Sequence, residues 1–184
     1  MKLKTYDKIF GTLFAVASIV IIVFFFSSNS FFEWAFERHH NTLSWYIRPL
    51  FIIPIVLGAF KKSYTIIFAS IFCLFTSMFW FPEPAKVDKN VVEFLEFEKD
   101  YLTTGWAADK AFVVVAVILF FTFLIYTTWN RKWKWLLFVI VISALLKVIH
   151  SVIFSGNSGL SIVKPAILGV VICASAILIL IKKR

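Results

Sequence analysis

Long runs of apolar residues, separated by short charged segments, recur along the whole chain. An α-helix needs about 20 apolar residues to cross the hydrocarbon core of a bilayer, or about 17 at the short end of the range. Six runs approach or reach this length. Since 61% of the 184 residues are hydrophobic, the chain also carries more apolar side chain than a small soluble domain can bury. The sequence therefore predicts an all-α integral membrane protein. The runs cover residues 9–26, 46–60, 63–81, 111–128, 133–154 and 161–181.

These runs predict a single polytopic membrane domain over residues 1–184, folded as a six-transmembrane-helix bundle. The first run is too long for the apolar part of a signal peptide, and no convincing small-x-small cleavage site follows it, so we expect an uncleaved first span. The second run is short and contains Pro49, Pro54 and Gly58. We expect this span to begin earlier, near Leu43, or to be kinked or partly re-entrant.

The charges between the runs predict the orientation of the bundle, because cytoplasmic loops of membrane proteins are rich in Lys and Arg. If the N-terminus lies inside and every run crosses, 11 of the 19 basic residues fall inside, with a single acidic residue, Asp7. The other nine of the ten acidic residues fall outside. This distribution predicts that both termini lie inside, in a multi-pass protein of a bacterial-type inner (plasma) membrane. The inside basic residues are Lys2, Lys4, Lys8, Lys61, Lys62, Arg131, Lys132, Lys134, Lys182, Lys183 and Arg184.

The tryptophans favour the same orientation, since their amphipathic rings prefer the headgroup level of a bilayer. Four of them lie at the predicted outer boundary and three at the inner one. The outer group is Trp34, Trp45, Trp80 and Trp106, and the inner group is Trp129, Trp133 and Trp135.

Two long outer segments, residues 27–45 and 82–110, are each expected to contain a short interfacial helix. Ser30 and Glu33 have the spacing of a capping box, which predicts a helix from Ser30 to about His40. Asn90 resembles a second helix start, with a helix to about Thr103. This second helix has an apolar face and an acidic face, so we expect it to lie on the membrane surface. The apolar face holds Val91, Phe94, Leu95 and Leu102, and the acidic face holds Glu93, Glu96 and Asp100.

Small residues recur at helical spacing in three of the runs, and such stripes let helices approach closely in lipid. We expect them to serve packing within the chain rather than a dimer seam. Cys73 and Cys173 lie on two of the stripes and far from any CxxC spacing, so we interpret them as packing residues. The stripes are Gly11, Ala15 and Ser18; Ala69, Cys73 and Ser77; and Ala166, Gly169 and Cys173.

A first candidate site lies in the outer half of the fifth run, where Lys147 and His150 share a helix face. A lysine at the bilayer centre costs about 2.5–3.5 kcal/mol, which favours an inward-facing polar site unless the side chain snorkels to the surface. If the fourth and fifth runs pack antiparallel, Asp109 lies level with His150 and can fix its tautomer or its charge. The first outer helix could add two histidines to this set. The candidate catalytic residues are therefore His150, Asp109, His39 and His40.

A second candidate is Arg48, just inside the outer end of the second run. Its guanidinium can bind a phosphate or a carboxylate with two hydrogen bonds, between Trp45 and Tyr46 as walls. The alternative is a residue at the membrane boundary that snorkels outward. Together the two candidates predict ligand binding by Lys147, His150, Arg48, Asp109, Trp45 and Tyr46.

A metal site is not predicted. Glu37 and His40 have the Glu-x-x-His spacing that carboxylate-bridged metal sites use, but such sites need a second pair from another helix. The sequence also lacks HExxH and any cluster of Cys and His. Glu37 and His40 are the residues that would supply ligands if a metal were bound.

The expected function is that of a membrane binding or transport module for an amphipathic or anionic small molecule or lipid, with a site that opens to the outer face. One alternative is a membrane-embedded enzyme that acts on lipid headgroups at the outer His and Asp residues. Another is a structural or accessory subunit whose acidic outer helix docks a protein partner. We expect membrane lipid as a partner, no cofactor, and no nucleic acid, because the basic residues form no stripe interleaved with stacking aromatics. The substrate and the oligomeric state stay open.

Overall fold

The computed structural model describes residues 2–105 and 107–182, with side chains from residue 4 onward. Within these residues all regular elements are helical, as predicted. Trp106, Lys183, Arg184 and the side chain of Lys2, which the orientation argument uses, lie outside the described residues. In chain order the elements are α1 Lys2–Ser27, α2 Asn29–His39, α3 Leu43–Ile47, η1 Arg48–Phe51, α4 Ile52–Lys61, α5 Tyr64–Thr76, η2 Ser77–Phe79, α6 Lys89–Thr103, α7 Ala108–Trp129, α8 Trp133–Ser155, η3 Gly156–Ile162 and α9 Val163–Lys182.

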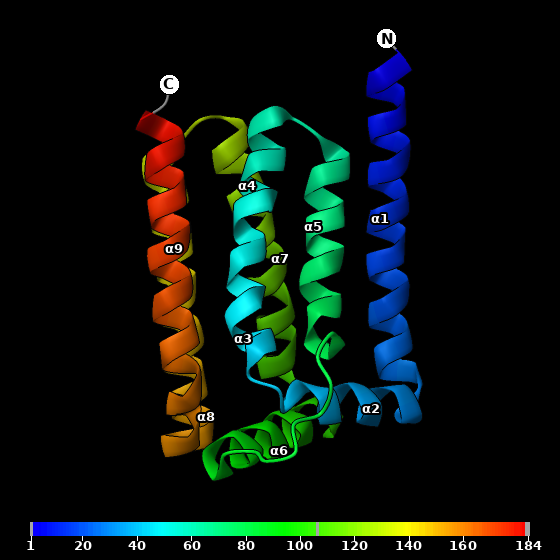
Figure 1. Cartoon of the computed structure of the whole chain (residues 1–184), viewed down its shortest axis with the longest axis vertical. Coiled ribbons are helices and arrows are strands. Elements are labelled where there is room, and N and C mark those ends of the chain that lie inside the picture. The colour runs from blue at the N-terminus through cyan, green and yellow to red at the C-terminus, as the bar shows by residue number, and fades with distance from the viewer. Residues whose placement is uncertain (1, 106, 183–184) are drawn as a thin grey trace.

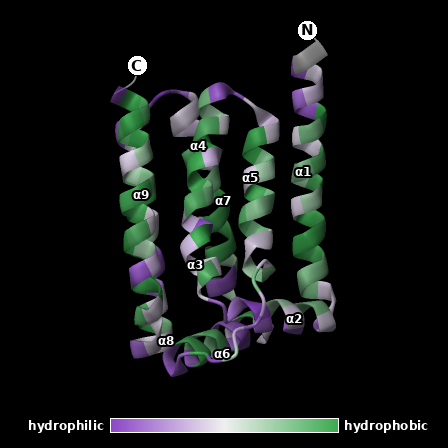
Figure 2. Ribbon diagram, viewed as in Figure 1, coloured by the Kyte–Doolittle hydropathy of each residue, from purple (hydrophilic) through white to green (hydrophobic). Residues whose placement is uncertain are grey.

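The long helices stand side by side as a bundle (Figure 1). The start of α1, the end of α9 and the turns that follow α4 and α7 lie at one end of the bundle, which we call the terminal end. α2 and α6 lie across the opposite end, which we call the capped end. Figure 2 shows apolar residues along the bundle helices and hydrophilic residues gathered at the two ends. This arrangement suits a protein whose middle contacts hydrocarbon.

Among the described residues, four helical segments are long and apolar enough to cross a membrane, by length and composition. The last of them is 50 residues long and contains both α8 and α9, which η3 connects. The outward faces carry large apolar side chains, and Ile19, Phe112 and Ile153 are 62%, 72% and 70% exposed. Such continuous apolar surface marks contact with lipid or with another protein. The segments are Lys4–Ser27, Leu43–Lys61, Ala108–Trp129 and Trp133–Lys182, and Tyr64–Phe79 is a shorter apolar helix.

The second apolar run forms one helical segment, Leu43–Lys61, so its expected early start near Leu43 is confirmed. This segment contains the 3₁₀ turn η1, which includes Pro49. Proline has no backbone N–H and disturbs the regular hydrogen bonds of a helix, which explains the tighter turn here.

The N-caps of both helices at the capped end lie two residues before the predicted ones. Ser28 caps α2, with its Oγ accepting a hydrogen bond from the Phe31 N–H at 3.3 Å. Asp88 caps α6, with its Oδ1 accepting from the Asn90 N–H at 2.8 Å. The predicted caps, Ser30 and Asn90, are therefore wrong and lie inside the first turns. The earlier residues have the same capping chemistry, and starting there adds backbone hydrogen bonds to each helix.

The predicted apolar face of α6 is confirmed. Val91, Phe94 and Leu95 are buried, and Leu102 packs against the same cluster. This cluster includes Phe32 and Phe36 of α2, Trp45 of α3 and Ile162 of η3. A salt bridge from Lys99 to Glu33 joins α6 to α2 at the surface. α6 is thus a lid over the capped end, held by apolar contacts along one face.

At the terminal end, Asp7 of α1 supplies the hydrogen bonds that the first turn of α5 lacks. Its carboxylate accepts from Ser63 Oγ at 2.6 Å, from the Tyr64 N–H at 2.9 Å and from the Thr65 N–H at 3.3 Å. The first N–H groups of a helix have no partner within the helix and need such acceptors. This contact fixes α1 against α5.

The small-residue stripe of the sixth run provides a close contact between two bundle helices. A Cβ added to Gly169 of α9 would lie 2.4 Å from Pro49 Cβ, and the Cys173 thiol donates a hydrogen bond to the Pro49 carbonyl at 3.2 Å. The stripe therefore serves packing within the chain, and it contacts the η1 turn that contains Arg48.

Substituting Gly169→Ala should destabilise the protein by about 1–3 kcal/mol, because overpacking forces the backbones apart. The measurement is the free energy of unfolding in mixed micelles. Gly105→Ala is the matched control, since a Cβ there meets no atom within 4 Å. Equal stability of the two variants would contradict this account of the α9 contact.

Candidate functional site

His39, the last residue of α2, is turned into the protein beneath α6. Its side chain is buried, and its ring packs 5.7 Å from the ring of Trp45, between centroids. The Trp45 indole N–H donates to His39 Nδ1 at 3.2 Å and to the His39 carbonyl at 3.1 Å. On the other side of the ring, Nε2 lies 3.8 Å from a carboxylate oxygen of Glu98 on α6. His39 thus connects α2, α3 and α6.

The hydrogen bonds of His39 indicate which ring nitrogen carries the proton. Because Nδ1 accepts from Trp45, the ring proton belongs on Nε2, which faces Glu98. Burial lowers the pKa of His39 well below 6.5, and the positive charges of Arg48 and Lys147 lower it further. The imidazole is therefore neutral at physiological pH, and its contact with Glu98 is not an ion pair.

Two cations and one carboxylate meet beside this histidine. Arg48 of η1, Lys147 of α8 and Glu98 of α6 interact electrostatically, the two cations repelling each other while Glu98 attracts both. Arg48 is half-buried, Lys147 is exposed on the surface of α8, and the Glu98 side chain is 37% exposed. We call His39, Arg48, Glu98 and Lys147 the capped-end charge cluster. It has one more positive than negative charge when His39 is neutral.

An open cavity of about 550 Å³ adjoins the cluster, with Trp45 between the two. Trp45 and Tyr46 form its aromatic side, and Lys164 at the start of α9 contributes a positive charge. Polar side chains supply most of the remaining lining, from Thr42, Asp88, Asn90, Asn157 and Ser161. A cavity of this size can hold the headgroup of an amphipathic molecule or a small metabolite.

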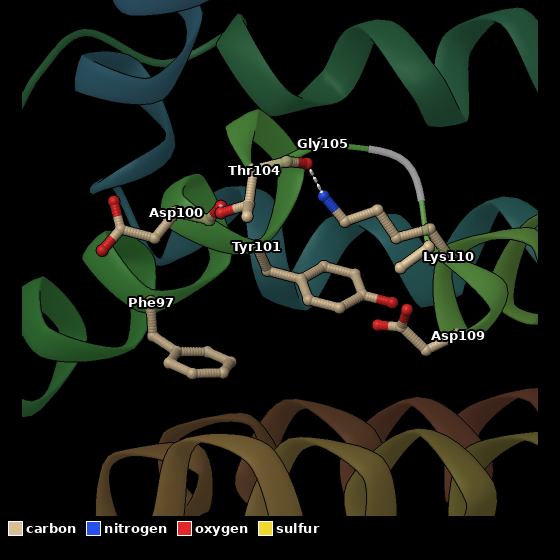
Figure 3. A pocket seen from close by; sticks show the side chains of 8 residues that line it. Phe97, Asp100, Tyr101, Thr104, Gly105, Asp109 and Lys110 are labelled. Atoms are coloured by element: carbon tan, nitrogen blue, oxygen red, sulfur yellow. Dashed lines mark hydrogen bonds between the residues drawn. The ribbon is translucent and has the colours of Figure 1, made fainter.

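A second, smaller cavity of about 290 Å³ lies between the end of α6 and the start of α7 (Figure 3). Tyr101 extends across it, and its hydroxyl points toward the Asp109 carboxylate. Burial raises the pKa of Tyr101, and Asp109 raises it further. The Lys110 ammonium donates a hydrogen bond to the Thr104 carbonyl, which closes one side of the cavity.

The predicted site residues divide between these two places. His39, Trp45, Arg48 and Lys147 gather at the capped-end charge cluster, and Tyr46 lines the larger cavity. Asp109 and His150 both contact Tyr101 instead, with 6.0 Å between the centroids of the Tyr101 and His150 rings.

The remaining candidates lie at the surface of α2. His40 Nδ1 contacts the Glu37 carbonyl at 3.2 Å, and the Glu37 side chain is exposed. Among the described residues, no group of three or more His, Cys, Asp or Glu side chains could hold a metal ion. Nothing in the geometry around Glu37 and His40 brings further ligands to them.

Glu98 and Tyr101 were not predicted as site residues. Glu98 had a usable signal, since it follows Phe94 by four residues and Leu95 by three and so shares their buried face. Tyr101 had no such signal, because its contacts with Asp109 and His150 depend on how α6 lies against α7 and α8.

Ser44, His39 and Glu98 have the residue types of a hydrolase triad, but their arrangement favours a structural role. Ser44 Oγ lies 3.2 Å from His39 Nδ1, yet it is fully buried and donates its proton to the Asn41 carbonyl at 2.9 Å. The Trp45 indole N–H already donates a hydrogen bond to His39 Nδ1. A substrate cannot reach this hydroxyl, and the histidine nitrogen that would act as base is engaged.

Comparisons with protein-family models, with curated proteins and with solved structures found no match for the chain.

The neutral state of His39 predicts a loss of stability in acid. An unfolded chain binds a proton at His39 below about pH 6.5, whereas the folded protein resists binding it until a much lower pH. The contribution of neutral His39 to the free energy of unfolding is thus fully present above pH 6.5 and decreases as the pH falls below it. Thermal unfolding between pH 8 and pH 5 should show this slope, and His39→Gln should reduce it. His40→Gln is the control, and an unchanged slope in His39→Gln would contradict the assignment.

Proposed function

We propose that the chain crosses the membrane six times, with the terminal end inside and the capped end outside, in a bacterial-type plasma membrane. The start of α1, the end of α9 and the turns after α4 and α7 lie at the terminal end, whereas α2 and α6 lie at the capped end (Figure 1). This arrangement supports the topology. The basic turns at the terminal end support the orientation. The shortest span is Tyr64–Phe79, about 24 Å long at 1.5 Å per residue, which suits a locally thinned bilayer.

At its capped end, the protein binds the anionic group of an amphipathic small molecule or lipid. The observation that carries this proposal is the shared field of Arg48 and Lys147, two cations with a single carboxylate, Glu98, acting on both. An excess charge in a low-dielectric region is costly unless a counter-charge accompanies it. A phosphate or carboxylate between the two cations supplies that counter-charge.

The residues of the site contact different parts of the ligand. The planar guanidinium of Arg48 donates two hydrogen bonds to an anion, while the Lys147 ammonium contributes a mobile point charge. Trp45 and Tyr46 offer apolar surface with a polar edge, which suits the region of a ligand between headgroup and chain. The exposure of Lys147 on α8 gives such a ligand a route from the surrounding lipid.

Binding is better supported than transport. Below the site, the bundle contains a continuous apolar core. The buried hydroxyls near it donate to carbonyls of their own helices, so they offer an anion no free donor; they belong to Ser70, Thr76, Ser77, Thr127 and Thr128. The largest fully buried side chains of the core are Ile55, Val56, Ile67, Leu124, Leu136 and Ile177.

A second candidate function is that of an accessory subunit that docks a protein through α6. Glu93, Glu96 and Asp100 are exposed on the face of α6 that points away from the bundle. This function is compatible with ligand binding, since the opposite face of α6 covers the charge cluster.

Binding of short-chain phosphatidylglycerol to the purified protein in neutral detergent tests the proposal. Arg48→Gln and Lys147→Gln should each weaken binding by about tenfold or more, since a hydrogen bond to a charged group contributes about 1.5–3 kcal/mol. Glu98→Gln should strengthen binding, because it removes the competing negative charge.

Lys86→Gln, in the exposed loop before α6, is the control for a simple loss of charge. Two further ligands identify which feature of the lipid is recognised. Short-chain phosphatidylcholine tests whether the net charge of the lipid is needed, and inorganic phosphate tests whether phosphate alone is bound. Unchanged affinity in both cluster variants would refute this function, and the accessory role would then be favoured.

A further inference from the structure

The larger cavity at the capped end is lined by polar side chains that the fold itself does not use. Five of them carry a hydroxyl or a carboxamide, and none of these groups hydrogen-bonds to another described residue. Two neighbouring serines differ, since Ser155 Oγ donates to the Ser151 carbonyl at 2.5 Å and Ser158 Oγ donates to the Ser155 carbonyl at 2.7 Å. The five therefore offer a ligand both donors and acceptors. They are Thr42, Tyr46, Asn90, Asn157 and Ser161.

The elements that carry these groups are fixed by packing. They are α3 with its N-cap, the first turn of α6, and η3. Trp45 of α3, Val91 of α6 and Ile162 of η3 belong to one buried apolar cluster. η3 also packs tightly on α8, since a Cβ added to Gly159 would lie 2.4 Å from the Ser151 carbonyl oxygen. The arrangement of polar groups is therefore formed before a ligand binds.

The chemistry of the lining suits a neutral, hydroxyl-rich group. Asp88 and Lys164 are the charged residues of the cavity, one of each sign, so the lining has no net charge. Hydroxyls and carboxamides both donate and accept, which matches the hydroxyls of a sugar or a cyclitol. Val91, Pro165 and Trp45 are buried and supply apolar surface, against which the C–H face of such a ring can pack.

We propose that this cavity binds a polyhydroxylated ring, a sugar or a cyclitol, that is attached to the anionic group of the ligand. The inference rests on the proposed function, which places the anionic group at Arg48 and Lys147. Trp45 donates a hydrogen bond to His39 of the charge cluster and also lines the cavity, and Arg48 follows Tyr46 by two residues. A phosphate bound at the cluster therefore leaves the ring that it carries beside Tyr46. The cavity of about 550 Å³ is large enough for such a ring.

The affinities of two short-chain lipids in neutral detergent, phosphatidylinositol and phosphatidylmethanol, test this site. Both lipids have the same negatively charged phosphate diester, but phosphatidylinositol alone carries a polyhydroxylated ring. The wild type should bind phosphatidylinositol about tenfold or more tightly than phosphatidylmethanol, since two hydrogen bonds to hydroxyls contribute about this factor.

The double variant Asn157→Ala/Ser161→Ala should lower the ratio of the two affinities by about tenfold, because it removes two of the groups that contact the ring. Asn29→Ala/Ser30→Ala is the matched control. It removes the same two side chains from the exposed start of α2, outside the cavity, and should leave the ratio unchanged. The thermal unfolding midpoint shows whether both variants fold.

Equal affinity of the wild type for the two lipids, or an unchanged ratio in Asn157→Ala/Ser161→Ala, would overturn the inference. Failure of the proposed function gives a different result, namely an affinity for phosphatidylmethanol that Arg48→Gln does not change. Glycerophosphoinositol, the soluble headgroup, identifies the source of the ring. An affinity equal to that of phosphatidylinositol would support the site with a free sugar phosphate as its ligand, and much weaker binding would support it with a lipid headgroup.

Discussion

The cost of placing charge in a low-dielectric helix bundle is the constraint on which the capped end depends. Arg48 and Lys147 belong to two bundle segments, and the carboxylate that acts on both, Glu98, comes from α6, outside the bundle. His39 reduces the cost by staying neutral. α6 must therefore remain docked for the cluster to exist, and its buried residue Leu95 and its neighbours hold it there.

The two ends of the bundle differ in the surroundings of their charged residues. At the capped end, α6 lies over His39 next to a cavity, and its Glu98 attracts both Arg48 and Lys147. At the terminal end, Lys62 and Arg131 lie over aromatic rings of neighbouring helices. An apolar core separates the two ends. This separation favours a site confined to the capped end over one continuous pathway.

The helices, the start of the second span near Leu43 and the apolar face of α6 could be predicted because they depend on local patterns of hydrophobicity. The helix caps could not, because Ser28 and Ser30 have the same capping chemistry and only the path of the chain selects between them. For the site, the cost of burying charge led to the prediction of Arg48 and Lys147, but Lys147 is exposed on α8 rather than turned into the bundle as expected. The contacts of Glu98 and Tyr101 depend on how α6 lies across the bundle, which no pattern within α6 determines.

The sidedness of the two ends is the central claim, and cysteine accessibility tests it most directly. Lys62→Cys and Lys89→Cys would be introduced separately after Cys73 and Cys173 are replaced by alanine, and intact cells would be treated with a membrane-impermeant maleimide. The account predicts that the cysteine at position 89 reacts from outside and that the cysteine at position 62 reacts only after the membrane is opened. Reaction of both cysteines from the same side would contradict it.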